Sequence, residues 1–288
     1  MQHIGPLIKR IRLDKGLTLK ETSEGIISIA FLSKFENQKN DISVSNLFAL
    51  LQRLKISPDE FYRLTSRYNS TPMYQFLQDL LPGLVNNDII FLNKKLDELS
   101  FNIYTFDSIF VLHYKILIEQ YINLYSKLPY NNKDINTISK YLIHNENWGN
   151  YELHLYSNFI KFLPLHTNLI LIKKAKNAAS SFVGTESYKH TVVLLYINFI
   201  NMLIVNNELL AARDTIKEIM PDLIDTKYFY EINKLNYLEG KIMIASGKIT
   251  EGKRIAEKAI DIMYQLQNSK IARAHKKSLD EFINSFLL

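Results

Sequence analysis

The chain has 288 residues, of which 47% are hydrophobic and 22% are charged, as in a folded soluble protein and unlike a disordered one. It has no cysteine, which excludes disulfides, thiolate metal sites and a cysteine nucleophile, and its 9 Gly and 7 Pro are too few for an all-β sandwich or barrel. The net charge is +6, and residues 1–67 hold 11 Lys and Arg against 7 Asp and Glu, which favours an anionic partner for this segment.

The first 64 residues predict five short helices separated by helix-capping residues. Thr18 and Glu21 have the spacing of a capping box at the start of the second helix, and residues 57–60 form another for the fifth. Ser28 is placed to cap the third helix, and we expect Asn37 to end it in the left-handed conformation. Leucines spaced i, i+3, i+4 and i+7 mark the fourth helix.

Beyond residue 65, long helical stretches alternate with short polar turns. The turns recur roughly every 35 to 45 residues, which is the length of one helical hairpin in an α-solenoid. In the last hairpin, small residues stand where a tetratricopeptide-like pair brings its helices together, at Gly240, Gly247, Gly252, Ala256 and Ala259. We therefore expect an all-α chain with two domains, residues 1–65 and 66–288.

The N-terminal pattern is that of a repressor-type helix-turn-helix. Residues 17–61, LTLKETSEGIISIAFLSKFENQKNDISVSNLFALLQRLKISPDEF, resemble its five-helix form in their caps, apolar stripe and LSKFEN element. The segment GIISIAFLSKFEN, followed by helical repeats, resembles the corresponding part of the Rgg/MutR family of bacterial transcription regulators. Two departures stand out: Gly25 comes early in the turn, and Gln38 occupies a place where relatives often have glycine.

The resemblance implies a DNA-binding site on the third helix. Ile29 and Ala30 would meet thymine methyl groups, and Lys34 would reach guanine. By position, the residues at the major groove are Ser28, Ile29, Ala30 and Lys34. Those at phosphate-contacting positions are Arg12, Thr18 and Lys39, with Arg10 on the same basic helix as a further candidate.

The family also implies that the repeats bind a short signalling peptide on their concave face. We find the residues on this face by counting back along the sequence from the last hairpin in steps of one repeat. They are Tyr156, Ile160, Leu194, Ile197, Asn198, Asn201, Lys234, Tyr237 and Lys241. Asparagine amides hold peptide backbone through both donor and acceptor, and the aliphatic neighbours favour a hydrophobic peptide. The alternative is that Asn198 and Asn201 pair with groups on neighbouring helices. Tyr237 and Lys241 are placed to meet a carboxylate of the ligand.

No pattern for other chemistry is found. The seven His lack zinc-protease spacing, and the sequence has no nucleophile elbow, phosphate loop or dinucleotide fingerprint, so we expect no metal, no cofactor and no enzymatic activity. The most apolar run, residues 191–205, contains two Asn and is too short to span a membrane. We therefore expect a cytoplasmic protein with no membrane partner.

The resulting hypothesis is a homodimeric transcriptional regulator that binds double-stranded DNA and is controlled by a short hydrophobic peptide, as in quorum sensing. The apolar stripe Leu279, Phe282, Ile283, Phe286 and Leu287 is a candidate dimer surface. Two alternatives remain. One is a ligand-independent regulator of the lantibiotic-activator type, whose repeats only dimerise; the other is a repeat scaffold for partner proteins.

Overall fold

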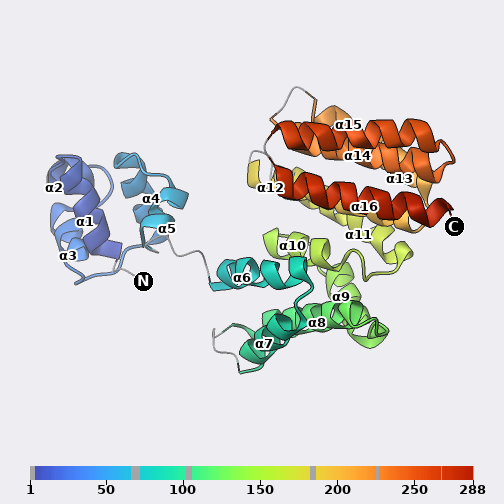
Figure 1. The fold of residues 1–288 in the computed structure, drawn as a ribbon. Helices are drawn as coiled ribbons and strands as arrows, with labels where there is room; N and C mark the ends of the chain where they lie inside the picture. Colours follow the sequence, from blue (N-terminus) through green and yellow to red (C-terminus); the bar gives the residue numbers. More distant parts are fainter. Residues whose placement is uncertain are drawn as a thin grey trace. The chain divides into compact units, whose positions relative to one another are not determined.

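The computed structural model describes residues 4–65, 72–101, 106–181, 186–224, 227–266 and 268–287, and every regular element in these ranges is helical (Figure 1). This confirms the predicted all-α class. The chain divides into two compact units, residues 1–106 and 107–288. The predicted domain boundary at residue 65 stays a prediction, because residues 66–71 lie outside the described ranges. Within those ranges, no helix is both long and apolar enough to cross a membrane.

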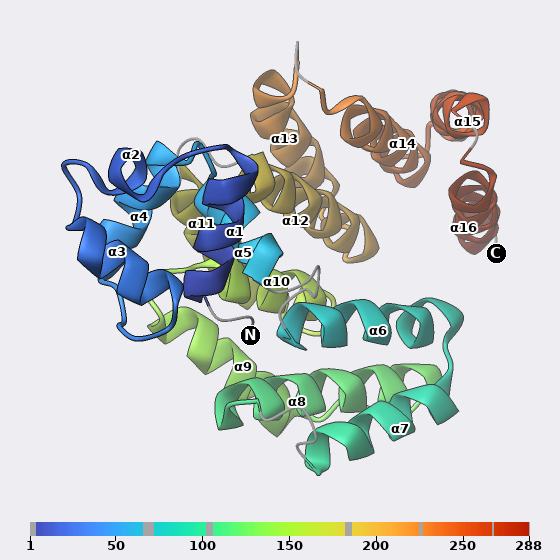
Figure 2. The ribbon, with the colours of Figure 1, turned by 90° about the vertical axis from the view of Figure 1, so that its left-hand side faces the viewer.

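The first unit contains the five predicted short helices and two longer ones (Figure 2). They are α1 (Ile4–Asp14), α2 (Leu19–Ser23), α3 (Ile29–Glu36), α4 (Val44–Arg53), α5 (Pro58–Thr65), α6 (Pro72–Asn86) and α7 (Ile89–Ser100). Leu7, Ile8, Leu32 and Leu50 are each at most 2% exposed and form the centre of the core under α1 to α5. This core fixes α2 and α3 against α1, so that one face of α3 remains free.

The short helices α2 and α3 are capped at their N-termini by the side chains that the sequence predicts. The Thr18 hydroxyl accepts from the amide of Glu21, and the Glu21 carboxylate accepts from the amide of Thr18. The Ser28 hydroxyl accepts from the amide of Phe31 at the start of α3. The expectation for Asn37 is wrong: its φ is −100°, and Gln38 takes the left-handed conformation with φ 61°. The side chain of Asn37 instead donates to the carbonyl of Ser33.

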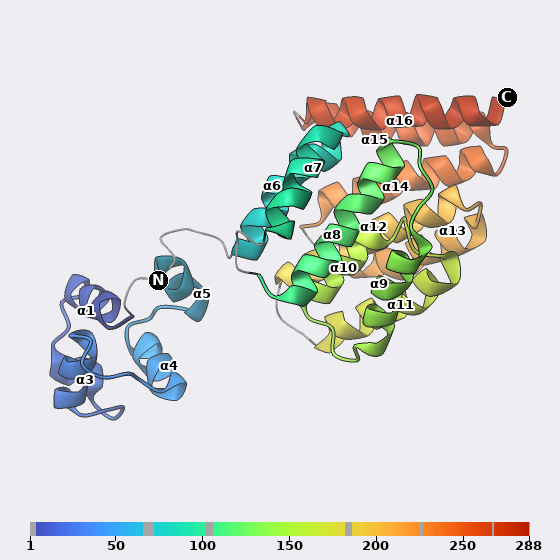
Figure 3. The same cartoon turned by 90° about the horizontal axis from the view of Figure 1, so that it is seen from below.

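The second unit is a series of helices in which α12 to α16 pack one after another (Figures 2 and 3). Its helices are α8 (Ser108–Tyr125), α9 (Asn132–His144), α10 (Asn150–Phe159), α11 (Leu165–Ser181), α12 (Glu186–Val205), α13 (Leu209–Ile219), the short 3-10 helix Met220–Asp222, α14 (Phe229–Ala245), α15 (Ile249–Gln265) and α16 (Ser269–Leu287). Leu279 on α16 is fully buried within this unit, while the side chains of Phe286 and Leu287 lie outside the described part of the chain.

Helices α14 and α15 approach most closely, as their small residues predict. A Cβ atom on Gly240 would lie 2.7 Å from the carbonyl oxygen of Gly252, and one on Gly252 would lie 2.5 Å from the carbonyl oxygen of Gly240. Gly247, with φ 87°, makes the turn between the two helices. No larger residue fits at positions 240 and 252 without separating the helices.

The end of α9 is stabilised from another helix. The ammonium group of Lys174 on α11 donates to the carbonyl oxygens of Leu142 at 3.2 Å and Asn145 at 2.7 Å, and also to that of Ile143. It lies 5.9 Å from the ring of Trp148, which is buried and donates to the carbonyl of Leu142. Lys174 therefore satisfies carbonyl groups that have no partner within the helix.

Candidate functional site

Helix α3 carries the residues expected to meet DNA bases. Ser28, Ile29, Ala30 and Lys34 are all exposed, whereas Leu32 and Phe35 on the opposite face are buried in the core. Ile29, in the first turn of α3, is 47% exposed. The arrangement gives α3 a mixed apolar and cationic outer face, which can contact thymine methyl groups and guanine acceptors.

Arg12 does not fit the expectation of a phosphate contact. Its side chain is 7% exposed, and its guanidinium donates to both carboxylate oxygens of Glu36 at 2.7 Å. A further bond reaches the carbonyl of Leu17 at 2.9 Å. The hydrogen bond and the charge of Glu36 raise the pKa of Arg12. Arg12 therefore joins the end of α1 to the end of α3 inside the unit, and its donors face away from solvent.

The other predicted phosphate contacts are on the surface. Arg10, Thr18 and Lys39 are exposed, and the hydroxyl of Thr18 also donates to Glu21. Hydrogen bonds from Thr18 hold the pKa of Glu21 below its usual value, which keeps the capping box intact. Arg53 on α4 is not marked by any sequence motif. Its guanidinium donates to the carbonyls of Glu21 and Glu24 and so holds α2 in place.

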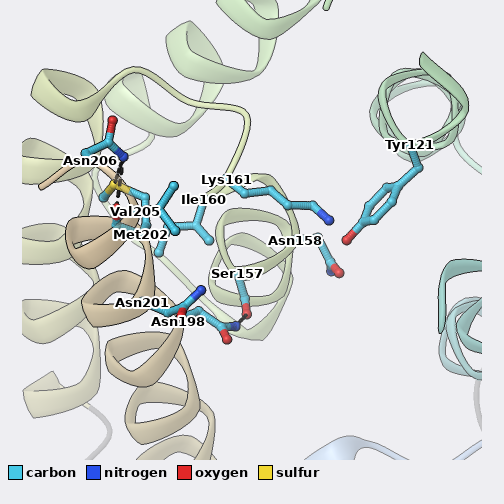
Figure 4. A pocket seen from close by; sticks show the side chains of 10 residues that line it. All are labelled: Tyr121, Ser157, Asn158, Ile160, Lys161, Asn198, Asn201, Met202, Val205 and Asn206. Carbon is cyan, nitrogen blue, oxygen red and sulfur yellow. Dashed lines mark hydrogen bonds between the residues drawn. The ribbon is translucent and has the colours of Figure 1, made fainter. Parts of the chain in front are cut away.

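In the second unit, two adjoining pockets form a groove along α12. The first, of about 260 Å³, lies between α8, α10 and α12 (Figure 4). It is lined by Tyr121, Ser157, Asn158, Ile160, Lys161, Asn198, Asn201, Met202, Val205 and Asn206. The second, of about 240 Å³, lies between α12, α14 and α16 and is lined by Ile197, Asn198, Asn201, Lys234, Tyr237, Leu238, Lys241, Ala274, His275 and Ser278. Asn198 and Asn201 belong to both pockets.

Most of the residues predicted for a peptide site lie in this groove. Ile160 lines the first pocket, and the second is lined by Ile197, Asn198, Asn201, Lys234, Tyr237 and Lys241. Leu194 is half-buried and lines neither pocket. Tyr156 is fully buried, and its hydroxyl donates to the carbonyl of Asn168 at 3.1 Å. The expectation that Tyr156 faces a ligand is therefore wrong, because its side chain belongs to the core.

The groove also contains residues that counting repeats along the sequence does not predict. Tyr121 comes from α8, Lys161 from the segment after α10, and His275 from α16. The ammonium group of Lys161 lies 3.8 Å from the ring centroid of Tyr121 on the opposite wall of the first pocket. Only the packing of helices far apart in the sequence brings these side chains to the groove.

The two shared asparagines are exposed, and each has one partner. Asn198 donates to the hydroxyl of Ser157 at 3.2 Å, and the side-chain oxygen of Asn201 accepts from the ammonium group of Lys241 at 3.3 Å. Each side-chain amide has more donors and acceptors than these single bonds use. The asparagines therefore link helices and still present polar groups to the groove.

The second pocket is cationic. Lys241 is only 5% exposed, and burial lowers its pKa to about 8. Burial also lowers the pKa of Lys234. The pKa of His275 is lowered chiefly by burial, and the charges of Lys234 and Lys241 lower it further. Within the described residues, no cluster of His, Asp and Glu could hold a metal ion.

Comparison with known proteins finds a family match in each part of the chain. Residues 93–277 match the family described as HTH-type transcriptional regulator Rgg, C-terminal domain, and residues 8–61 match a helix-turn-helix family. The fold is similar to that of a protein from Listeria monocytogenes EGD-e, with 23% identity, a TM-score of 0.84 and coverage of 99% of both chains.

Two further solved structures have the same fold. The SHP pheromone receptor Rgg2 of Streptococcus dysgalactiae has 22% identity and a TM-score of 0.77, over 96% of this chain and 98% of the receptor. PlcR of Bacillus thuringiensis, solved in complex with the peptide PapR7 and DNA, has 17% identity and a TM-score of 0.61, over 97% of this chain and 99% of PlcR.

Proposed function

Because the chain belongs to the Rgg family of helix-turn-helix transcriptional regulators, we propose that it binds promoter DNA as a homodimer under the control of a short hydrophobic peptide. The peptide occupies the groove along α12 and acts as a signal between cells. Since its target is chromosomal DNA, the protein works in the cytoplasm.

DNA binding is assigned to the exposed face of α3 and to basic residues around it. Ser28, Ile29, Ala30 and Lys34 contact base edges, while Arg10, Thr18 and Lys39 contact phosphates. The exposure of these side chains supports the assignment, and the burial of Arg12 removes it from the set. One such helix reads one half-site, so two copies of the chain are needed for two half-sites about 34 Å apart.

Peptide binding is carried by one observation, the pair of adjoining pockets that share Asn198 and Asn201. Each pocket alone is smaller than the ~300–1,000 Å³ of ordinary ligand sites, so an extended ligand would occupy both. Aliphatic wall residues such as Ile160 and Ile197 suit apolar side chains, and the amides suit peptide backbone. Rgg2 is a pheromone receptor, and PlcR binds both a peptide and DNA, which supports the same pairing of functions here.

The test is isothermal titration calorimetry of the full chain with synthetic apolar heptapeptides, selected from a mixed pool by co-elution with the protein. We expect a negative heat-capacity change, because apolar surface is buried. Asn201→Ala should weaken binding at least tenfold, about 1.4 kcal/mol. The matched control is Asn236→Ala, since Asn236 is exposed on α14 and lines neither pocket.

Fluorescence anisotropy with labelled promoter fragments then connects the two sites. A bound peptide should change the DNA affinity of the wild type, and the change should be absent in Asn201→Ala at the same peptide concentration. DNA binding that no peptide affects would support the ligand-independent regulator instead. A chain that binds no promoter fragment, and that sediments as a monomer, would contradict the proposal.

A further inference from the structure

The groove is more strongly cationic than the unit around it. Residues 107–288, which form that unit, contain 22 Lys and Arg and 18 Asp and Glu. The two pockets are lined by Lys161, Lys234, Lys241 and His275 and by no carboxylate. The concentration of positive charge in the groove attracts a negatively charged ligand group.

Lys241 is the most deeply placed of these cations. It is 5% exposed, and within the described residues no Asp or Glu lies within ion-pair distance of its ammonium group. Its neighbours are the side-chain oxygen of Asn201 at 3.3 Å and the ring of Phe282 at 4.4 Å. Lysines at this level of burial are ordinarily paired with an opposite charge. Lys241 has only a long amide hydrogen bond and an aromatic face.

The groups that face Lys241 from the surrounding helices do not neutralise it. Lys234 lies on the same helix and His275 on α16, and the charges of Lys234 and Lys241 both help to lower the pKa of His275. Tyr237 donates its hydroxyl to the backbone carbonyl of His275, so that hydroxyl is already committed within the protein. The pocket therefore lacks one anionic group.

We propose that the ligand of this groove carries a carboxylate that binds Lys241, and that the second pocket holds the C-terminal residue of the peptide. This inference rests on the proposed function and adds the charge and the direction of the ligand. A carboxylate beside a desolvated ammonium forms a strong charge-assisted hydrogen bond. It replaces the long hydrogen bond that Lys241 donates to Asn201, whose side-chain oxygen then becomes free to accept from the peptide backbone.

The size and wall of the pocket favour a terminal residue over an acidic side chain. A volume of about 240 Å³ accommodates little more than one residue. The wall formed by Ile197, Leu238 and Ala274 contacts an apolar side chain, while Lys241 contacts the charge. An apolar residue with a free α-carboxylate satisfies both, whereas Asp or Glu satisfies only the second. The rest of the peptide then passes Asn198 and Asn201 toward the first pocket.

The pocket can be tested without knowing the peptide. N-acetyl-L-leucine has the apolar side chain and the α-carboxylate, and N-acetyl-L-leucinamide has the same side chain without the charge. We expect the acid, and not the amide, to shift the imidazole NMR signal of His275 in the full chain, with that signal assigned from His275→Gln. Lys241→Met should weaken the effect of the acid at least tenfold, and Lys258→Met, an exposed lysine on α15, should leave it unchanged. Equal shifts from acid and amide, or no shift from either, would overturn the inference.

The peptides selected above provide the second arm. Each is made with a free C-terminus, as a C-terminal amide, and with any Asp or Glu replaced by Asn or Gln. We expect the amide to bind at least tenfold more weakly, a difference that Lys241→Met abolishes. If only the replacement of Asp or Glu weakens binding, the ligand does bind through a carboxylate, but the assignment of that carboxylate to the C-terminus is wrong. If amide and acid bind equally, the proposed function stands and this inference falls. If no peptide binds, the proposed function falls, and the leucine derivatives still decide the role of Lys241.

Discussion

The ion pair between Arg12 and Glu36 makes a strong prediction about the stability of the DNA-binding unit. Arg12→Met removes both 2.7 Å bonds to Glu36, whose side chain is only 2% exposed, and leaves a buried carboxylate without its counter-charge. Removing one partner of a buried pair costs about 3–5 kcal/mol. A small unit is stable by only about 5–15 kcal/mol, so this change brings it close to unfolding.

The protein provides a convenient internal control for the measurement. Trp148 is the single tryptophan, and it lies in the second unit. Urea unfolding followed by tryptophan fluorescence therefore reports on that unit, whereas far-ultraviolet circular dichroism reports on the helices of both. With a slope of about 1–3 kcal/mol per molar urea, Arg12→Met should lower the midpoint of the first dichroism step by about 2 M. The fluorescence midpoint should not move.

The double variant Arg12→Met/Glu36→Leu separates the loss of a pair from the presence of an unpaired charge. Two apolar residues of similar size often restore or exceed the stability of a buried pair. We expect the double variant to recover most of the midpoint, although the bond from Arg12 to the carbonyl of Leu17 is still lost. A midpoint shift below about 0.5 M in Arg12→Met, or a double variant no more stable than the single one, would refute the reasoning.

Three further predictions follow from the same structure. Burial lowers the pKa of Lys241 from 10.5 to about 8, so the ammonium form destabilises the fold below pH 8, and this cost disappears as pH rises from 8 toward 10.5. Lys241→Met should raise the free energy of unfolding at pH 7 by up to about 3 kcal/mol. It should also reduce the gain in stability between pH 8 and 10 in urea titrations, to which Lys161, with its pKa lowered to about 8, also contributes; an unchanged stability at pH 7 would contradict the burial cost. Gly252→Ala should lower the fluorescence midpoint by the equivalent of about 1–3 kcal/mol, because its Cβ meets the carbonyl of Gly240; a rise in stability from improved helix propensity would show that the helices separate freely. In anisotropy titrations, Lys34→Ala should reduce discrimination between bases at one position of the DNA site by roughly 1–3 kcal/mol. Arg10→Ala should instead weaken binding to all DNA fragments alike and reduce the slope of log K against log salt concentration by about one; the reverse pattern would exchange their roles.

The helix starts of the first unit were predictable because capping depends on residues three apart. Thr18 with Glu21 and Ser28 with Phe31 bond as the sequence indicates. The end of α3 was not predictable from Asn37 alone, because the whole turn selects the residue that becomes left-handed. Gln38 takes that conformation although Asn tolerates it well. The pairing of Arg12 with Glu36 spans 24 positions, and a motif comparison by position does not reveal it.

In the groove too, features that depend on nearby residues were predictable from the sequence, and contacts between distant helices were not. Counting repeats back from α14 identified the face of α12 that carries Asn198 and Asn201, because a regular helix keeps its register over several turns. The count failed at Tyr156, where α10 turns a different side toward the core. Lys161 and His275 were not predicted, since they reach the groove only through the packing of neighbouring helices.

The way in which Lys174 terminates α9 has a consequence for the order of folding. A helix that ends at its own glycine can complete its last turn alone, but the carbonyls of Leu142 and Asn145 bond to a side chain from α11, about thirty positions further along the chain. That turn gains its partners only after α11 docks. In a φ-value analysis, Lys174→Met therefore reports when α11 docks: slower folding places docking before the transition state, and faster unfolding places it after.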